Sequence, residues 1–182
     1  MGEGSKLQRL YRQWRSAVKY KKDPQFNSQE LKFLQEHLTD WERALFEQMD
    51  YVDQRHALAV SQSVVTDPRL HSEEDKLNLI KAALLHDIGK IRGDFTITQR
   101  VLAKIIKHIF PEYRKKLLVK GEKSKPGTLA RAVFVQEIHP NRGAYMLSVS
   151  GTDQAVVELV RNHHNIPRNR LERILQDSDR KN

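Results

Sequence analysis

One short stretch, residues 84–90, limits what this chain can fold into. It consists of Leu-Leu-His-Asp-Ile-Gly-Lys and continues an apolar run that begins at Ala82. The pattern predicts a helix that enters a hydrophobic core, where burying the imidazole of His86 and the carboxylate of Asp87 is costly unless a partner satisfies them. Two interpretations are open at this point. Either the pair binds a metal ion, or it belongs to an ordinary last turn that Gly89 caps in the left-handed conformation.

The composition narrows the kinds of site that the chain can build. Its 182 residues suggest one domain, or one domain with a helical extension. Cysteine is absent, so any transition metal must be held by histidine and carboxylate side chains. No apolar run approaches the roughly 18 residues that span a bilayer, and the first residues lack the apolar core of a signal peptide. We therefore expect a cytoplasmic protein without a transmembrane segment.

The net charge of +9 is concentrated in two blocks. Residues 1–22 hold seven Lys and Arg against one acid, and residues 100–131 hold ten against two. Residues 23–99 are acidic, with fourteen acids against eight bases. Such blocks attract phosphate-bearing ligands, nucleic acid or anionic lipid. The alternative, which is frequent for charge runs, is a pair of well-solvated helix faces.

Apolar side chains recur at helical spacing along the chain, and no alternating β pattern of useful length is present. The sequence therefore predicts an all-α fold. Caps and breakers place helices over residues 5–20, 29–37, 40–49, 51–65, 73–85, from Thr96 or Thr98 to about 109, 128–138, 139–149, 154–162 and about 171–179. The basic residues 112–126, with Gly121 and Pro126 as breakers, are expected to form a mobile or lid-like segment.

Histidine and aspartate side chains stand on apolar faces or at the ends of several of these helices. Inward-facing helices of a bundle can converge on one pocket, and bundles build metal sites in this way. Imidazoles and carboxylates without thiolates suit Mn, Fe, Zn, Ni or Co, and a set of this size could hold two ions. The candidates are His56, His86, Asp87, His139, His163, His164 and Asp179.

The order His, His-Asp, His, His-His, Asp resembles that of the HD-domain metal-dependent phosphohydrolase superfamily. Residues 84–90 resemble its HDIG branch, and the resemblance covers about residues 51–180. It implies an HD-domain helical bundle that binds one or two divalent ions (Mn, Fe, Ni, Co, Zn or Mg). It also implies hydrolysis of a phosphomonoester or phosphodiester, most often of a nucleotide, by a metal-activated hydroxide. Residues 51–182 would form this core, with a basic insert at about 100–131, and residues 1–50 would be a helical extension packing on it.

The chemistry and positions of these residues also predict roles for single side chains. Asp87 would bridge two metals, and the seven candidates above would be the ligands. Lys90 would act with Asp87 in catalysis and contact the substrate phosphate, for which Arg142, Arg161, Lys115 and Lys116 are further candidates.

Two features differ from known branches of the family. The Gly-Tyr-Pro signature of the cyclic di-guanylate branch would follow the histidine pair, but Asn165-Ile166-Pro167-Arg168 stands there. The interval between His86 and His139 is longer than in compact members, and the surplus is the basic segment.

Other functions remain open from the sequence alone. One is a non-catalytic nucleotide-sensing or nucleic-acid-binding module that uses the basic segments. Another is attachment to a membrane surface through residues 5–20 and 101–120. The substrate and the oligomeric state, a homodimer included, are not decided by the sequence.

Overall fold

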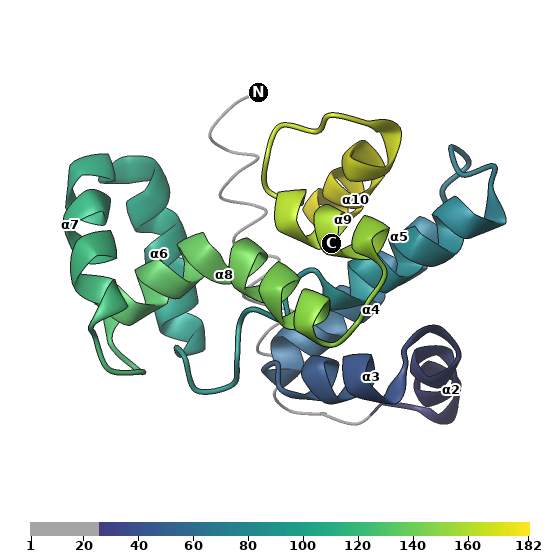
Figure 1. The fold of residues 1–182 in the computed structure, drawn as a ribbon. Helices are drawn as coiled ribbons and strands as arrows, with labels where there is room; N and C mark the ends of the chain where they lie inside the picture. The colour runs from purple at the N-terminus through teal and green to yellow at the C-terminus, as the bar shows by residue number, and fades with distance from the viewer. Residues whose placement is uncertain (1–25) are drawn as a thin grey trace. The chain divides into compact units, whose positions relative to one another are not determined.

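The computed structural model describes residues 26–182, which are helical and contain no β-strand (Figure 1). The all-α prediction is therefore confirmed for this part of the chain. The helix expected over residues 5–20 lies outside the described residues. The helices are α2 (Ser28–His37), α3 (Asp40–Glu47), α4 (Tyr51–Val65), α5 (Glu73–Leu85), α6 (Ile97–Ile109), α7 (Pro111–Glu122), α8 (Leu129–Val149), α9 (Gln154–Asn162) and α10 (Arg170–Lys181).

Side-chain caps set the starts of several helices where the sequence predicts them. Asn27 accepts a hydrogen bond from the N–H of Glu30 at 2.9 Å, and the Glu30 carboxylate accepts one from the N–H of Asn27. Thr39 and Thr96 make the same reciprocal arrangement. Ser72 accepts from the N–H of Asp75 at the start of α5. Each cap satisfies backbone donors that a helix start leaves without partners.

The described chain divides into two compact units. The first unit contains residues 26–90 together with His139–Asn182, and the second is Ile91–Ile138. In the first unit α5 packs against α4, α9 and α10. The last turn of α5, residues 82–85, is entirely apolar and fully buried, and Ile88 just beyond it is also fully buried. The run that leads to His86-Asp87 is therefore core, as the sequence predicts.

A buried ion pair helps to hold α3 to this core. Glu42 is 2% exposed, and its carboxylate lies 3.0 Å from Nζ of Lys81 on α5. The carboxylate also accepts hydrogen bonds from the N–H of Thr39 and the hydroxyl of Thr152, both at 2.9 Å. Burial raises the pKa of Glu42, but these donors outweigh burial and hold the pKa below its ordinary value.

In the second unit, α6, α7 and the first part of α8 bury a small apolar cluster that includes Ile106, Leu117 and Val133. The expectation of a lid-like segment at residues 112–126 is wrong for most of its length, since α7 runs from Pro111 to Glu122. Pro111 stands at the first helical position, where its missing N–H costs nothing. Gly121 lies inside α7 and does not break it. Glycine is needed there for space, since a Cβ would lie 2.2 Å from the carbonyl oxygen of Ala130.

Two helices are predicted on either side of His139-Pro140, but the structure has one. Helix α8 continues through Pro140 to Val149. A proline within a helix removes one hydrogen bond and tends to kink the chain, a local cost that buried side chains can offset. Val135 and Ala144, on either side of the proline, are both fully buried.

Replacing Glu42 with glutamine should lower the free energy of unfolding at pH 7 by about 2 kcal/mol, because the charged acceptor of a buried network is lost. Since the pKa of Glu42 is lowered in the folded state, its contribution is present above the ordinary pKa of 4.5 and disappears as the pH falls below it. Urea denaturation should therefore show the difference between Glu42→Gln and wild type narrowing below that pH. Glu36→Gln, which removes an exposed pair with Lys32, is the control and should change stability by less than about 0.5 kcal/mol. Equal effects of the two substitutions would contradict the prediction.

Candidate metal centre

Seven polar side chains from five segments of the first unit converge at one place. His56 comes from α4, His86 and Asp87 from the end of α5, His139 from α8, His163 and His164 from the end of α9, and Asp179 from α10. His86, Asp87, His139 and His163 are each at most 3% exposed. The structure thus brings together all the residues for which the sequence predicts metal binding.

Two of these histidines are held in the same way. His86 and His163 are the C-terminal caps of α5 and α9. Nδ1 of His86 donates to the carbonyl of Ala83 at 2.9 Å, and Nδ1 of His163 donates to that of Val160 at 2.6 Å. In a neutral imidazole this places the single proton on Nδ1 and leaves the Nε2 lone pair directed into the cluster. Sequence reasoning does not find these carbonyls, because any residue type can supply one.

The first group consists of His56, His86 and Asp179, whose candidate ligand atoms lie within 4.8 Å of one another. Nε2 of His56 is 2.9 Å from Oδ1 of Asp179, and Nε2 of His86 is 3.9 Å from the same oxygen. Burial lowers the pKa of His56, but the hydrogen bond and charge of Asp179 outweigh it and raise the pKa above its ordinary value. Burial raises the pKa of Asp179, yet His56 and His86 hold it well below its usual range.

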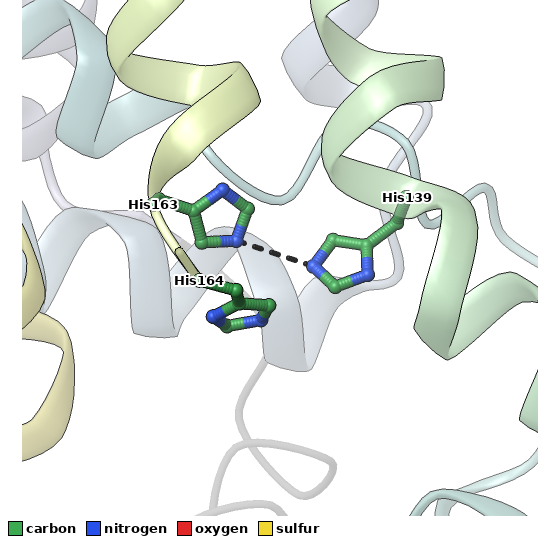
Figure 2. A group of neighbouring side chains, drawn as sticks. All are labelled: His139, His163 and His164. Atoms are coloured by element: carbon green, nitrogen blue, oxygen red, sulfur yellow. Dashed lines mark hydrogen bonds between the residues drawn. The ribbon is translucent and has the colours of Figure 1, made fainter. Parts of the chain in front are cut away.

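The second group consists of His139, His163 and His164, again with ligand atoms within 4.8 Å (Figure 2). Nε2 of His139 lies 3.2 Å from Nε2 of His163. Burial, with the charge of Lys90, lowers the pKa of His139 to about 3. Burial and the neighbouring His164 lower that of His163 well below its ordinary value. Both rings are therefore neutral at pH 7, the form in which imidazole binds a metal.

Asp87 lies between the two groups. Its Oδ2 is 3.5 Å from Nε2 of His86, and its Oδ1 is 3.2 Å from Nε2 of His139. Burial raises the pKa of Asp87, but Lys90, with Nζ at 2.6 Å, and His86 keep it well below its ordinary value. An ionised carboxylate buried among ring nitrogens that carry lone pairs needs compensating positive charge, and Lys90 supplies one unit of it. This donor set, all imidazole and carboxylate, fits one or two divalent ions.

Of the two interpretations of residues 84–90, the one in which Gly89 caps α5 in the left-handed conformation is wrong. The glycines with positive φ in the described chain are Gly93, Gly127 and Gly151. Gly89 is needed for space instead, since a Cβ there would come within 2.1 Å of the carbonyl oxygen of His139. Gly143, one turn further along α8, lies against the Gly89 backbone, and its own Cβ would be 3.3 Å from the Gly89 nitrogen. This close approach of the turn to α8 brings Asp87 next to His139.

The predicted phosphate-binding residues have different surroundings. Lys90 is buried against Asp87. Arg142 donates to the carbonyl of Gly89 at 3.2 Å, and Arg161 pairs with Glu158 at 2.6 Å. The remaining two, Lys115 and Lys116, lie on α7 in the other unit.

Comparison with known proteins gives one match. The family model described as HD domain matches residues 54–181, which is more than half of the chain. No curated protein and no solved structure matches. No helix within residues 26–182 has the length and apolar character needed to cross a membrane.

Replacing Gly89 with alanine should destabilise the metal-free protein by about 3 kcal/mol, since the added Cβ meets backbone that cannot move aside cheaply. Gly143→Ala is the graded comparison, because its Cβ would meet its nearest atoms at 3.3 Å, and its cost should be about 1 kcal/mol. Urea denaturation in the presence of a chelator measures both. A Gly89→Ala protein as stable as Gly143→Ala would contradict the assigned contact.

Proposed function

Because the chain belongs to the HD-domain family, we propose that it is a metal-dependent phosphohydrolase that cleaves a phosphomonoester or phosphodiester of a nucleotide. HD domains are typically metal-dependent hydrolases. The observation that carries the proposal is the pair of three-residue groups with the buried carboxylate of Asp87 between them.

The two groups would hold the ions, with Asp87 shared between them. Bound there, Mn, Fe, Ni, Co, Zn or Mg would act as a Lewis acid on the attacking water and on the phosphoryl oxygens. The surroundings of these ligands favour cation binding, because they keep His139 and His163 neutral and Asp87 and Asp179 ionised at pH 7. No proton then needs to leave these four side chains when a cation enters.

Lys90 is the proposed contact to the substrate phosphate within this unit. Its Nζ already lies at the cluster, 2.6 Å from Oδ1 of Asp87, at the end of a flexible four-carbon side chain. From this position the ammonium would supply positive charge to an anionic substrate at the cluster. Arg142 and Arg161 are weaker candidates because each is already engaged, with the Gly89 carbonyl and Glu158 respectively.

The proposal is tested by metal content and hydrolysis together. Purified wild type should bind a divalent ion and hydrolyse nucleotide mono- or diesters with Mn, Co, Ni or Mg. His86→Ala and Asp87→Ala should each lower kcat by at least about a hundredfold, as expected when a catalytic ion is misplaced. His71→Ala, which changes an exposed histidine before α5, should retain full activity.

Hydrolysis that survives both cluster substitutions would refute the proposal. Tight nucleotide binding without turnover would favour the non-catalytic sensing module instead.

A second function, binding of single-stranded nucleic acid, is favoured by α7. Residues 91–138 carry eleven Lys and Arg against four acids. Lys116, Lys120 and Lys123 recur at helical spacing along one flank of α7, are exposed, and form no ion pair with any described residue. Phe110 and Tyr113, at the start of the helix, are 54% and 50% exposed.

Lysines that meet phosphates and aromatic rings that stack on bases are the two elements of single-strand binding. A membrane-bound helix would instead insert its apolar face. Helix α7 uses that face, with Leu117 and Gly121, inside its own unit.

Fluorescence anisotropy with a labelled oligothymidylate tests this second function. The triple variant Lys116→Glu, Lys120→Glu, Lys123→Glu should bind at least about tenfold more weakly, and its plot of log K against log salt should flatten by about 2. Lys32→Glu, Arg43→Glu, Arg170→Glu has the same net charge and should bind as wild type. Equal binding by the two triple variants, or binding to anionic vesicles without binding to the oligonucleotide, would exclude it.

A further inference from the structure

The loop that leaves α9 begins with His163-His164 and is held by side chains of α10. Nε2 of Gln176 donates to the carbonyl of His163 at 3.3 Å and to that of Asn165 at 2.9 Å. These two carbonyls flank the segment His164-Asn165. One amide therefore holds the backbone immediately before His164 and one residue after it.

His164 depends on its backbone more than the other two histidines of its group do. His139 and His163 are at most 1% exposed, and Nδ1 of His163 has a backbone partner. His164 is the exposed member of the group, and its ring lies edge-on to that of His139 and tilted to that of His163, without a hydrogen bond to any described residue. This ring is less enclosed than the other two, so the direction of its Cα–Cβ bond has more influence on where the ring lies.

Helix α10 presents a row of polar side chains to this region. Glu172, one turn before Gln176, accepts a hydrogen bond from the N–H of Arg168 at 2.7 Å and so holds the far end of the loop. Asp179 follows Gln176 by three residues, on the neighbouring part of the same helix face, and belongs to the first group of ligands. Gln176 is 6% exposed, so it is buried where it makes these contacts. The sequence alone does not single out Gln176, because its role depends on carbonyls of the loop after α9.

We propose that Gln176 is a positioning residue that fixes His164 beside His139 and His163 and thereby sets the affinity of this second group for its cation. The inference rests on the proposed metal centre. Gln176 acts through His164 and touches neither ion. The first group, His56, His86 and Asp179, does not depend on it, because its two histidines lie on other helices and Asp179 is held by the body of α10.

Gln176→Met tests this role, since methionine has a similar length but no donor. Calorimetric titration of the metal-stripped full chain with Mn²⁺ should show one wild-type affinity and one weakened by about 10- to 100-fold, the usual cost of losing a partner that orients a ligand. Gln54→Met is the matched control. Gln54 is also a buried glutamine that donates to two backbone carbonyls, that of Glu47 at the end of α3 and that of Met49 in the loop before α4. This control should retain both affinities even if it loses as much stability.

A double-mutant cycle separates positioning from general destabilisation. His164→Ala should weaken the same affinity, and adding Gln176→Met to His164→Ala should produce no further loss, because both changes act on one ring. If Gln176→Met does not fold, Gln176→Asn, which keeps a donor on a shorter side chain, takes its place in the cycle.

Unchanged affinities in the variant, or additive losses in the cycle, would overturn the role of Gln176 and leave the metal centre standing. Wild type that binds no divalent ion would instead overturn the proposed function itself, and this inference with it.

Discussion

The burial of one carboxylate among imidazole rings is the constraint on which the rest of the first unit depends. Asp87 is 3% exposed and ionised, and nitrogens of three histidines lie within 3.9 Å of its oxygens. Such a centre is stable only if each ring is held by something outside it. His86 and His163 have such support in carbonyls of their own last helical turns, whereas His56 is paired with Asp179 within its own ligand group. The helix ends therefore serve as the outer support of the site.

Much of this architecture could be predicted from local sequence patterns, because those patterns act locally. Capping side chains reach backbone donors three residues away, so Asn27 and Thr39 mark helix starts without tertiary information. The apolar run before His86 predicts its own burial. The set of ligand candidates could be assembled because each has a residue type that binds metal. The order of these candidates along the chain resembles that of the HD-domain superfamily, and the family match at residues 54–181 confirms this resemblance.

The features that sequence reasoning missed depend on contacts between distant segments. Gly89 and Gly121 resemble helix breakers, yet each lies where a backbone from α8 leaves no room for a Cβ. Pro140 resembles a boundary, yet buried side chains on both sides carry α8 through it. Gln176 is unremarkable along the chain and acquires a role only because the loop after His163 returns to α10. The type of a residue allows several roles. Which of these it has in the protein depends on contacts with segments that are distant in the sequence.

The contact between Gly89 and His139 also bears on how this chain could have acquired its second unit. The chain leaves the first unit after Lys90 and re-enters it at His139, and the backbones on either side of that gap touch. The segment between these two points, residues 91–138, therefore begins and ends close to the contact between Gly89 and His139. The cost of closing such an excursion grows only slowly with its length. This junction is therefore a place where evolution can lengthen, shorten or exchange an inserted segment while the histidines and aspartates on either side keep their positions.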